Sequence, residues 1–427
     1  FIYCVRKDQP MNLFSVLFLI VLSAGMAVQL WLARRQIAFV YRHRDQVPAS
    51  FAAQILLTDH QKAADYTLAK TRFGQMEIVV GTLWLLVWTL GGGLDLLDQM
   101  WRSLELNPLL TGVGFMISTF VLMALLDLPF SLYRTFVIEQ RFGFNRTTPK
   151  LFIADLVKQT LLMLLLGVPF AAVVLWLMEA SGNLWWLYVW LVWMGFALFM
   201  MWAYPAFIAP LFNKFKELQD GGLVERIQAL LKRCGFTSKG VFVMDGSRRS
   251  GHGNAYFTGL GTHKRIVFFD TLMDTLNPVE IEAVLAHELG HFKRKHVQKR
   301  MAIMFAMSLA GLALLGWLIE QPWFYEGLGI TQPSRHTALI LFLLAMPVFT
   351  FFLYPILAYF SRKDEFEADD FAAQQADPRA LIEALVKLYK ENASTLTPDP
   401  LYSAFHDSHP PATARVAHLL TKIPHLA

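Results

Sequence analysis

The chain has 427 residues, of which 55% are hydrophobic and only 17% are charged, and its mean hydropathy is +0.41. This composition excludes an ordinary soluble enzyme and indicates an integral membrane protein. The net charge of +5 is carried in particular loops and not in a basic-aromatic stripe, so nucleic acid is not an expected partner. Two cysteines, Cys4 and Cys234, lie too far apart to suggest a disulfide framework.

The first apolar run follows a short segment of different character. Residues 1–10 precede Met11, which we expect to be the natural start, with residues 1–10 a non-native leader. Leu13 to Ala33 is 21 residues without a charge, enough to cross about 30 Å of hydrocarbon. No basic segment precedes this run and no small-residue cleavage site follows it, which favours a retained span over a signal peptide.

Six further apolar runs are long enough to cross a membrane. They are Ile78 to Leu94, Leu106 to Leu126, Gln159 to Met178, Leu184 to Ile208, Met301 to Ile319 and Ala338 to Phe360. The loops after the first and third spans are rich in basic residues: Arg34, Arg35, Arg42, Arg44, Lys62, Lys70 and Arg72, then Arg134, Arg141, Arg146 and Lys150. The loops on the opposite side carry little, with Arg102 in one and Arg335 in another. The positive-inside rule therefore predicts an N-terminus outside the cell and a C-terminus in the cytoplasm.

Three charged residues lie inside the apolar runs or at their edges: Asp127, Asp155 and Lys158. Charges at membrane depth usually face an interior cavity, which would mean that the bundle is not solid. End residues whose side chains reach back to the membrane surface would give the same pattern. The sequence leaves both interpretations open.

The soluble segments define the expected domain organisation. Residues 11–212 hold spans one to five, residues 213–300 form a large insert, residues 301–360 hold spans six and seven, and residues 361–427 complete the soluble part. The insert begins with an amphipathic helix that ends at Gly235. Short β-prone runs follow, so we expect a small α+β domain outside the membrane.

A helix with the pattern His-Glu-x-x-His lies at the end of the insert. Asn277 and the Pro and Glu that follow it are typical of a helix start, and we predict a helix from Pro278 to His296. His287 and His291 share one face of this helix. Two imidazoles at that spacing can hold one zinc ion, and Glu288 is placed to take a proton from the attacking water. A helix with two surface histidines is the alternative.

Such a site needs a third protein ligand from another element. His296 is five residues after the second histidine and is expected to face elsewhere on the helix, and residue 297 is valine. The best candidate is Glu365, with Asp369 on the same helical face to hydrogen-bond a ligand histidine. A solvated acidic helix face is the alternative for this run.

Substrate-binding residues are expected in two further places. Asn254 to Thr258 is a candidate edge strand, and such strands commonly align a peptide by backbone hydrogen bonds. We expect Asn254 and Tyr256 to hold the peptide backbone, although an ordinary hairpin strand would look the same. In the histidine-rich tail, His409 or Arg415 would steady the oxyanion, with capping or helix packing as the alternative.

Several motifs in one order resemble those of the type I CAAX prenyl proteases, a family of integral-membrane zinc metalloproteases. The resemblance runs from about Arg34 to Leu420, and its matching stretches are Phe136 to Asn145, Pro210 to Phe215, Asn254 to Gly259, His287 to His291, Ser361-Arg362 with Glu365 and Ala368-Asp369, and His409-Pro410-Pro411 with Arg415. It implies a mainly α fold in which seven membrane helices form a barrel around a water-filled chamber. It also implies a zincin-like domain with His287, His291 and Glu365 on one zinc and Glu288 as the base.

One feature departs from this family. Prenylated substrates belong to eukaryotes, whereas the compact chain with its short loops looks prokaryotic. We therefore expect the protease chemistry to carry over, in a bacterial inner membrane with the catalytic domain in the cytoplasm. Peptides or proteins are the expected partners besides the lipid bilayer, with prenylated or membrane-bound ones and membrane protein quality control among the options.

Two other classes of function fit the membrane spans. A transporter or channel could carry an incidental His-Glu pair, but no inverted repeat is visible and the metal motif lies in a soluble insert. A membrane chaperone or clearance factor is the second rival. Zinc content and peptide cleavage by the purified protein separate these readings.

Overall fold

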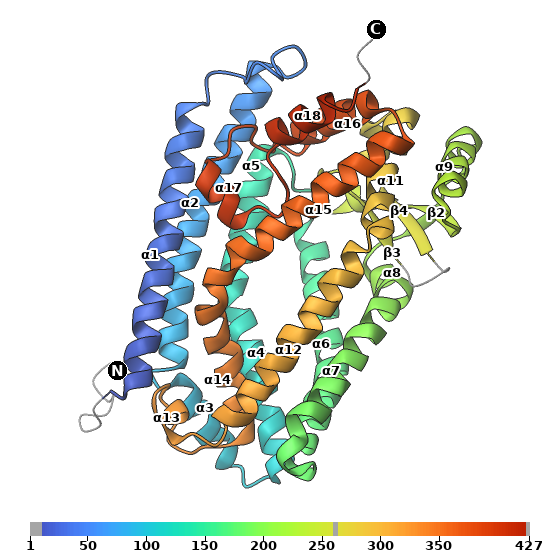
Figure 1. Ribbon diagram of the computed structural model, residues 1–427. Coiled ribbons are helices and arrows are strands. Elements are labelled where there is room, and N and C mark those ends of the chain that lie inside the picture. Colours follow the sequence, from blue (N-terminus) through green and yellow to red (C-terminus); the bar gives the residue numbers. More distant parts are fainter. Residues whose placement is uncertain (1–10, 259–263, 424–427) are drawn as a thin grey trace.

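A computed structural model describes residues 11–258 and 264–423, so the predicted leader at residues 1–10 lies outside the described residues. The chain forms a long bundle of helices with a small mixed domain at one end (Figure 1). Helix α1 begins at the opposite end of the bundle, and helix α18 lies in the domain (Figure 1). This arrangement agrees with an odd number of membrane crossings.

The helices of the first half are α1 (Leu13–Arg42), α2 (Leu57–Trp88), α3 (Gly93–Arg102), α4 (Pro108–Tyr133), α5 (Gln140–Phe142), α6 (Pro149–Ala180), α7 (Trp185–Ala203), α8 (Ala209–Phe212) and α9 (Gly221–Cys234). Those of the second half are α10 (Asp270–Thr275), α11 (Pro278–Lys293), α12 (His296–Leu318), α13 (Pro322–Glu326), α14 (Arg335–Thr350), α15 (Tyr354–Gln375), α16 (Pro378–Glu391), α17 (Pro400–His406) and α18 (Ala412–Leu420).

The strands are β1 (Phe215–Glu217), β2 (Ser238–Met244), β3 (Ala255–Thr258) and β4 (Lys264–Phe269). Two π-helical segments, η2 (Arg134–Glu139) and η4 (Tyr204–Ile208), extend α4 and α7. Three short 3-10 segments are η3 (Gly182–Leu184), η5 (Gly246–Arg248) and η6 (Phe351–Leu353).

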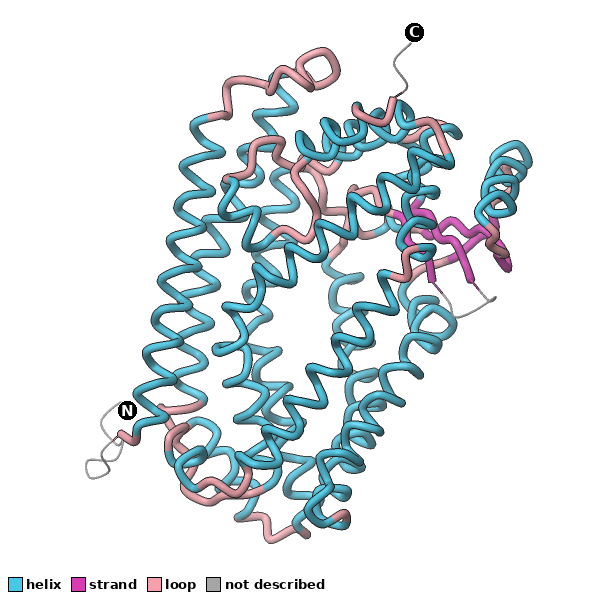
Figure 2. Tube along the Cα trace, viewed as in Figure 1, coloured by secondary structure: helices cyan, strands magenta, loops and turns pink. Residues whose placement is uncertain are grey.

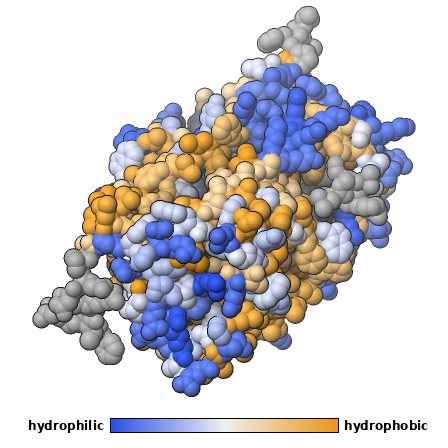
Figure 3. Space-filling model, turned by 60° about the horizontal axis from the view of Figure 1, so that its bottom comes forward, coloured by the Kyte–Doolittle hydropathy of each residue, from blue (hydrophilic) through white to orange (hydrophobic). Residues whose placement is uncertain are grey.

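Six helical segments of the described chain are long and apolar enough to cross a membrane, and the bent pair α2–α3 makes a seventh. The pair turns by 45° at a run of glycines, where Gly92 has a φ of 77° that side chains disfavour. All seven predicted apolar runs overlap these segments almost entirely, so the predicted polytopic helical fold is confirmed. Hydrophobic residues form a broad belt on the surface between two more hydrophilic regions (Figure 3).

In the Cα trace the membrane helices run apart from one another along the middle of the bundle (Figure 2). A cavity of about 960 Å³ lies at the domain end of the bundle, with walls from α1, α2, the insert and the C-terminal segment. At the opposite end a buried apolar cluster closes the bundle, with Phe115, Phe324 and Leu341 among its members. The barrel is therefore open inside near the domain and filled at the far end.

The sheet of the domain has the order β1-β2-β4-β3, with β2 and β4 parallel and the other pairs antiparallel. One face, with Val241, Ile266 and Phe268, packs into the core that also contains Ile281 and Leu285 of α11. Strand β3 is paired on one side only, so it is an edge strand, as the sequence predicted. Strand β1 was not predicted, because three residues carry too little periodic signal.

Of the three charged residues in or beside the apolar runs, Asp155 and Lys158 have hydrogen-bond partners on the insert or its flanking helix. Asp155 accepts two hydrogen bonds from Arg249, at 2.7 and 2.9 Å, and Lys158 donates to the carbonyl oxygen of Leu211. Both side chains therefore tie the insert and its flanking helix to α6. Asp127 is exposed.

The helix predicted from Pro278 to His296 is interrupted. Helix α11 ends at Lys293, and Lys295 has a left-handed φ of 60° before α12 begins at His296. The prediction that His296 continues the same helix was therefore wrong. The break turns the chain back toward the bundle and changes where His296 points.

Candidate active site

The two histidines of the motif are held by a well-capped and buried helix. The Asn277 side chain accepts hydrogen bonds from the N–H groups of Val279 and Glu280, and the Glu280 carboxylate accepts one from the Asn277 N–H. This is a capping box, which fixes the helix start. Most of α11 between Glu280 and Gly290 is buried in the domain core, so the helix presents its histidines from a rigid support.

Helix α15 crosses α11 at very short range. A Cβ atom on Gly290 would lie 2.9 Å from the Cα and 3.0 Å from the carbonyl oxygen of Ala368. No side chain fits between the two helices at this point, which explains a glycine and an alanine here. The close crossing places Glu365 and Asp369 of α15 beside the histidines.

Three side chains bring their metal-binding atoms together at this crossing. The Nε2 atoms of His287 and His291 are 3.3 Å apart, and the two carboxylate oxygens of Glu365 lie 3.4 and 3.3 Å from them. Ligand atoms about 2.0 to 2.1 Å from a tetrahedral zinc ion are separated by about 3.3 Å. The three side chains therefore fit a zinc site, and they are the candidate metal group found in the described part of the chain.

The Glu365 carboxylate supports the same interpretation. Its side chain is only 5% exposed, and its Oε2 atom has only long contacts, 3.4 Å to Nε2 of His287 and 3.7 Å to Nη1 of Arg415. A buried charged oxygen that is so weakly paired is costly, and a bound cation would satisfy it.

The outer nitrogen of His287 is held by a buried ion pair. Its Nδ1 atom lies 2.8 Å from Oδ1 of Asp369. The same carboxylate accepts two hydrogen bonds from Arg415, from Nη2 to Oδ1 and from Nε to Oδ2. Burial has the largest effect and lowers the pKa of His287, but hydrogen bonds to Asp369 and Glu365 together raise it to about 9. The carboxylates thus favour positive charge at this position, and they point the Nε2 atom at the other ligands.

The outer nitrogen of His291 has a partner that the sequence did not indicate. Its Nδ1 atom lies 3.0 Å from Nδ1 of His296, whose Nε2 atom lies 3.2 Å from the Glu367 carboxylate. Because Lys295 breaks the helix, His296 returns to the back of His291 instead of facing elsewhere. Glu367 therefore acts through His296 and is not in the donor cluster.

A pocket of about 360 Å³ opens beside the donor cluster and is lined by two of its members. Its walls include Glu288, His287 and Glu365, together with Asn254 and Ala255 at the start of β3. Glu288 is partly exposed, whereas His287 is buried. A carboxylate open to this pocket can exchange protons with water there without being a ligand.

The structure separates the two residues expected to hold a peptide. Asn254 lines the pocket of Glu288, but the Tyr256 side chain points to a different cavity beside Pro205 and Pro210. The Tyr256 hydroxyl lies 3.9 Å from Sδ of Met244. A role for Tyr256 in holding a peptide is therefore restricted to its backbone on the edge strand.

The two candidates for the oxyanion also differ. The Arg415 guanidinium is buried and donates hydrogen bonds to Asp369. Its Nη1 atom also lies 3.7 Å from Oε2 of Glu365. His409 is 62% exposed, and its Nε2 atom lies 3.4 Å from Glu365. His409 is the one whose ring is free to meet a substrate, whereas Arg415 supports Asp369.

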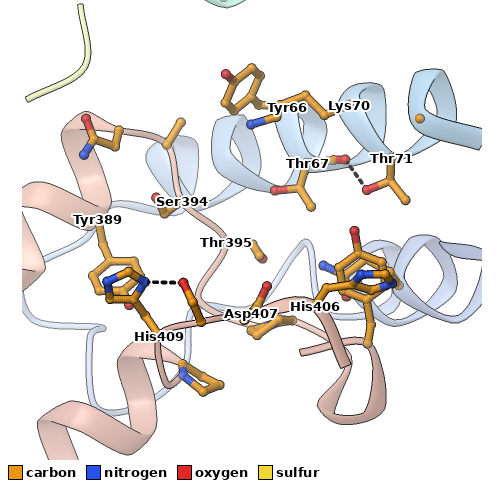
Figure 4. A pocket seen from close by; sticks show the side chains of 18 of the residues that line it. Tyr66, Thr67, Lys70, Thr71, Tyr389, Ser394, Thr395, His406, Asp407 and His409 are labelled. Carbon is orange, nitrogen blue, oxygen red and sulfur yellow. Dashed lines mark hydrogen bonds between the residues drawn. The ribbon is translucent and has the colours of Figure 1, made fainter. Parts of the chain in front are cut away.

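The pocket continues into the larger cavity of about 960 Å³, because Gly253, Asn254, Tyr389, Asn392, Ser394 and His409 line both. Figure 4 shows this cavity with Tyr66 and Lys70 of α2 on one side and Asp407 and His409 on the other. The donor cluster thus faces the interior of the barrel.

A donor cluster of two histidines and a glutamate, with a carboxylate beside it and a barrel of membrane helices beneath it, defines an integral-membrane metalloprotease. Comparisons with known proteins agree. Residues 36–214 match the CAAX prenyl protease N-terminal domain with five membrane helices, and residues 217–423 match peptidase family M48. The chain belongs to peptidase family M48, and it is a metalloendopeptidase of the CAAX prenyl protease type.

Full-length relatives show the same similarity. A CAAX prenyl protease 1 homolog of Dictyostelium discoideum is 35% identical over 395 residues, which cover 88% of this chain and 90% of that protein. CAAX prenyl protease 1 of Saccharomyces cerevisiae is 33% identical over 84% of this chain and 85% of its own length. The crystal structure of S. mikatae Ste24p superposes with a TM-score of 0.89 at 30% identity, covering 96% of this chain and all of that one. None of these matches supports a transporter or a chaperone.

Replacing Glu365 and Glu367 separately tests the donor cluster. Glu365→Ala should leave the purified protein with little zinc, whereas Glu367→Ala should weaken zinc binding by about tenfold at most, because it acts only through His296. Zinc is measured by elemental analysis and by competition with a chelator. Equal zinc affinity in the two variants would refute the choice of Glu365.

Proposed function

We propose that this chain is a zinc endopeptidase with one zinc ion per chain, held by His287, His291 and Glu365. The observation that carries the proposal is the spacing of the three side chains: the two imidazole Nε2 atoms are 3.3 Å apart, and each lies 3.3 to 3.4 Å from one oxygen of the buried Glu365 carboxylate. Zinc, when bound, supplies a Lewis acid and makes water a better nucleophile near neutral pH. Asp369 fixes the orientation of His287.

Glu288 is the proposed general base. It takes a proton from the attacking water and passes it to the leaving amine, which it can do because it borders the pocket and is not a ligand. His409 donates an N–H to the oxyanion that develops on the scissile carbonyl. The peptide lies along β3, whose free edge offers backbone N–H and C=O groups near the same pocket.

The substrate class is a peptide or protein segment that enters the interior cavity from the membrane or its surface. The relatives are named for prenylated CAAX substrates, and we infer that lipidated or membrane-bound peptides are among those cut here. We place the catalytic domain and the C-terminus in the cytoplasm and the N-terminus outside, in a bacterial inner membrane. The basic residues of the loops on the domain side support that orientation.

Replacing the base tests the division of roles. Glu288→Gln should keep the fold and about one zinc per chain but lower kcat by roughly 10²- to 10⁴-fold, the usual effect of losing a general base. Zinc content and kcat are measured on the same detergent-purified sample. A variant that loses its metal would show that Glu288 is a ligand.

Removing the lipid from the substrate tests how the peptide is bound. A plain apolar peptide should be cleaved, because backbone pairing along β3 requires no lipid, and a farnesyl group should improve binding by about 0.8 kcal/mol per buried methylene. The measurement is kcat/KM for one peptide with and without its farnesyl group, with a chelator-treated control. Cleavage of the lipidated peptide alone would identify a prenyl-specific enzyme instead.

Cysteine labelling tests the orientation. In a background without Cys4 and Cys234, Lys232→Cys on exposed α9 should react with an impermeant reagent only after the cells are opened. Glu105→Cys, in the exposed turn between α3 and α4, should react in intact cells. The reverse pattern would overturn the proposed topology.

A further inference from the structure

Gly253, two residues before the edge strand β3, is held by one side chain from the far side of the pocket. Oδ1 of Asn392 accepts a hydrogen bond from the Gly253 N–H at 3.0 Å, and Nδ2 of Asn392 donates to the Gly253 carbonyl oxygen at 3.3 Å. Gly253 is followed by Asn254 and Ala255, which line the pocket of Glu288. One amide thus pairs with both backbone polar groups of the residue where the strand enters the site.

Asn392 is presented by an unusual turn. It follows the last residue of α16, and the next residue, Ala393, has a φ of 43° and is only 2% exposed. A left-handed conformation is unfavourable for alanine and persists where the surrounding structure enforces it. Here Ala393 is packed in a cluster with Tyr66, Ile138 and Phe144.

His252 supports the same amide from behind. Because Oδ1 of Asn392 faces the Gly253 N–H, its orientation is fixed, and the contact of 3.3 Å with Nδ1 of His252 requires that Nδ1 carry the hydrogen. The other face of the imidazole meets the membrane helices. Its Nε2 atom lies 3.4 Å from both the Tyr66 hydroxyl and the Glu139 carboxylate, and the Phe144 ring stacks on it at 4.2 Å.

We propose that Asn392, supported by His252, is a positioning residue that sets the height and register of β3 relative to Glu288. The strand has a neighbour on one side only, so its pairing with β4 alone does not fix it against α11. The two hydrogen bonds between Asn392 and Gly253 attach the strand at a second point besides β4. Through His252 and its contacts with Tyr66 and Glu139, they also connect the strand to α2 and η2. The inference rests on the proposed binding of peptide along β3.

The role of Asn392 is tested by measuring peptide binding and turnover in the full-length enzyme. Asn392→Ala should raise KM, and the Ki of an uncleavable peptide of the same sequence, by about tenfold or more, as expected for two lost hydrogen bonds. The zinc content should stay at about one per chain. Asn392→Asp keeps the acceptor for the Gly253 N–H and loses the donor. Its KM and Ki should lie between those of the unmodified enzyme and those of Asn392→Ala. Asn107→Ala, which removes an asparagine–backbone hydrogen bond at the far end of the bundle, is the matched control and should leave Ki unchanged.

A substrate with a methylated backbone nitrogen separates positioning from general destabilisation. If Asn392 places the strand, methylation of the nitrogen that pairs with β3 weakens binding in the unmodified enzyme and weakens it less in Asn392→Ala. Fully multiplicative effects, or an unchanged Ki in Asn392→Ala, would overturn the inference while leaving the protease intact. An unmodified enzyme with neither zinc nor cleavage would overturn the proposed function itself, and this inference with it.

Discussion

The site depends on one buried carboxylate. Glu365 lies between two imidazoles at the crossing of α11 and α15, where Gly290 leaves no room for another side chain. Burying such a charge is unfavourable unless a cation or several donors compensate for it. The capped helix, the ion pair of Asp369 with Arg415 and the return of His296 all serve to hold the groups around this oxygen in one arrangement.

Most of the membrane architecture and the two histidines of the donor set could be predicted from local sequence patterns, whereas Glu365 was selected over a solvated acidic helix face mainly through the family resemblance. Seven apolar runs specify seven crossings, and residues spaced by four place His287 with His291 and Glu365 with Asp369 on shared helical faces. The errors have a common origin in geometry that no local pattern records. The left-handed Lys295 redirected His296, and the Tyr256 side chain lines a different cavity from the one that Asn254 lines, although the two residues are only two positions apart. Asn392 gave no signal, because its role is a contact between residues 139 positions apart.

The domain is attached to the membrane helices by polar contacts from several parts of the chain. Arg249 binds Asp155 of α6, and Arg35 of α1 lies 2.9 Å from Asp399 before α17. Tyr66 donates to Glu139 at 2.5 Å beside His252. Charge-assisted bonds of this kind are directional, so they fix the orientation of the domain on the barrel more firmly than apolar packing alone. The pocket of Glu288 and the larger cavity therefore keep a fixed position relative to each other.

The size of the pocket that Glu288 lines has a consequence for selectivity. At about 360 Å³ this pocket is in the range that small ligands occupy, and it is far smaller than any folded domain. A polypeptide can reach Glu288 only as a short extended stretch, so a compact protein must first release a tail or a loop. The cleavage rate then depends on how often a segment of the substrate unfolds locally. The size of the pocket thus selects proteins with flexible segments before any side chain is recognised.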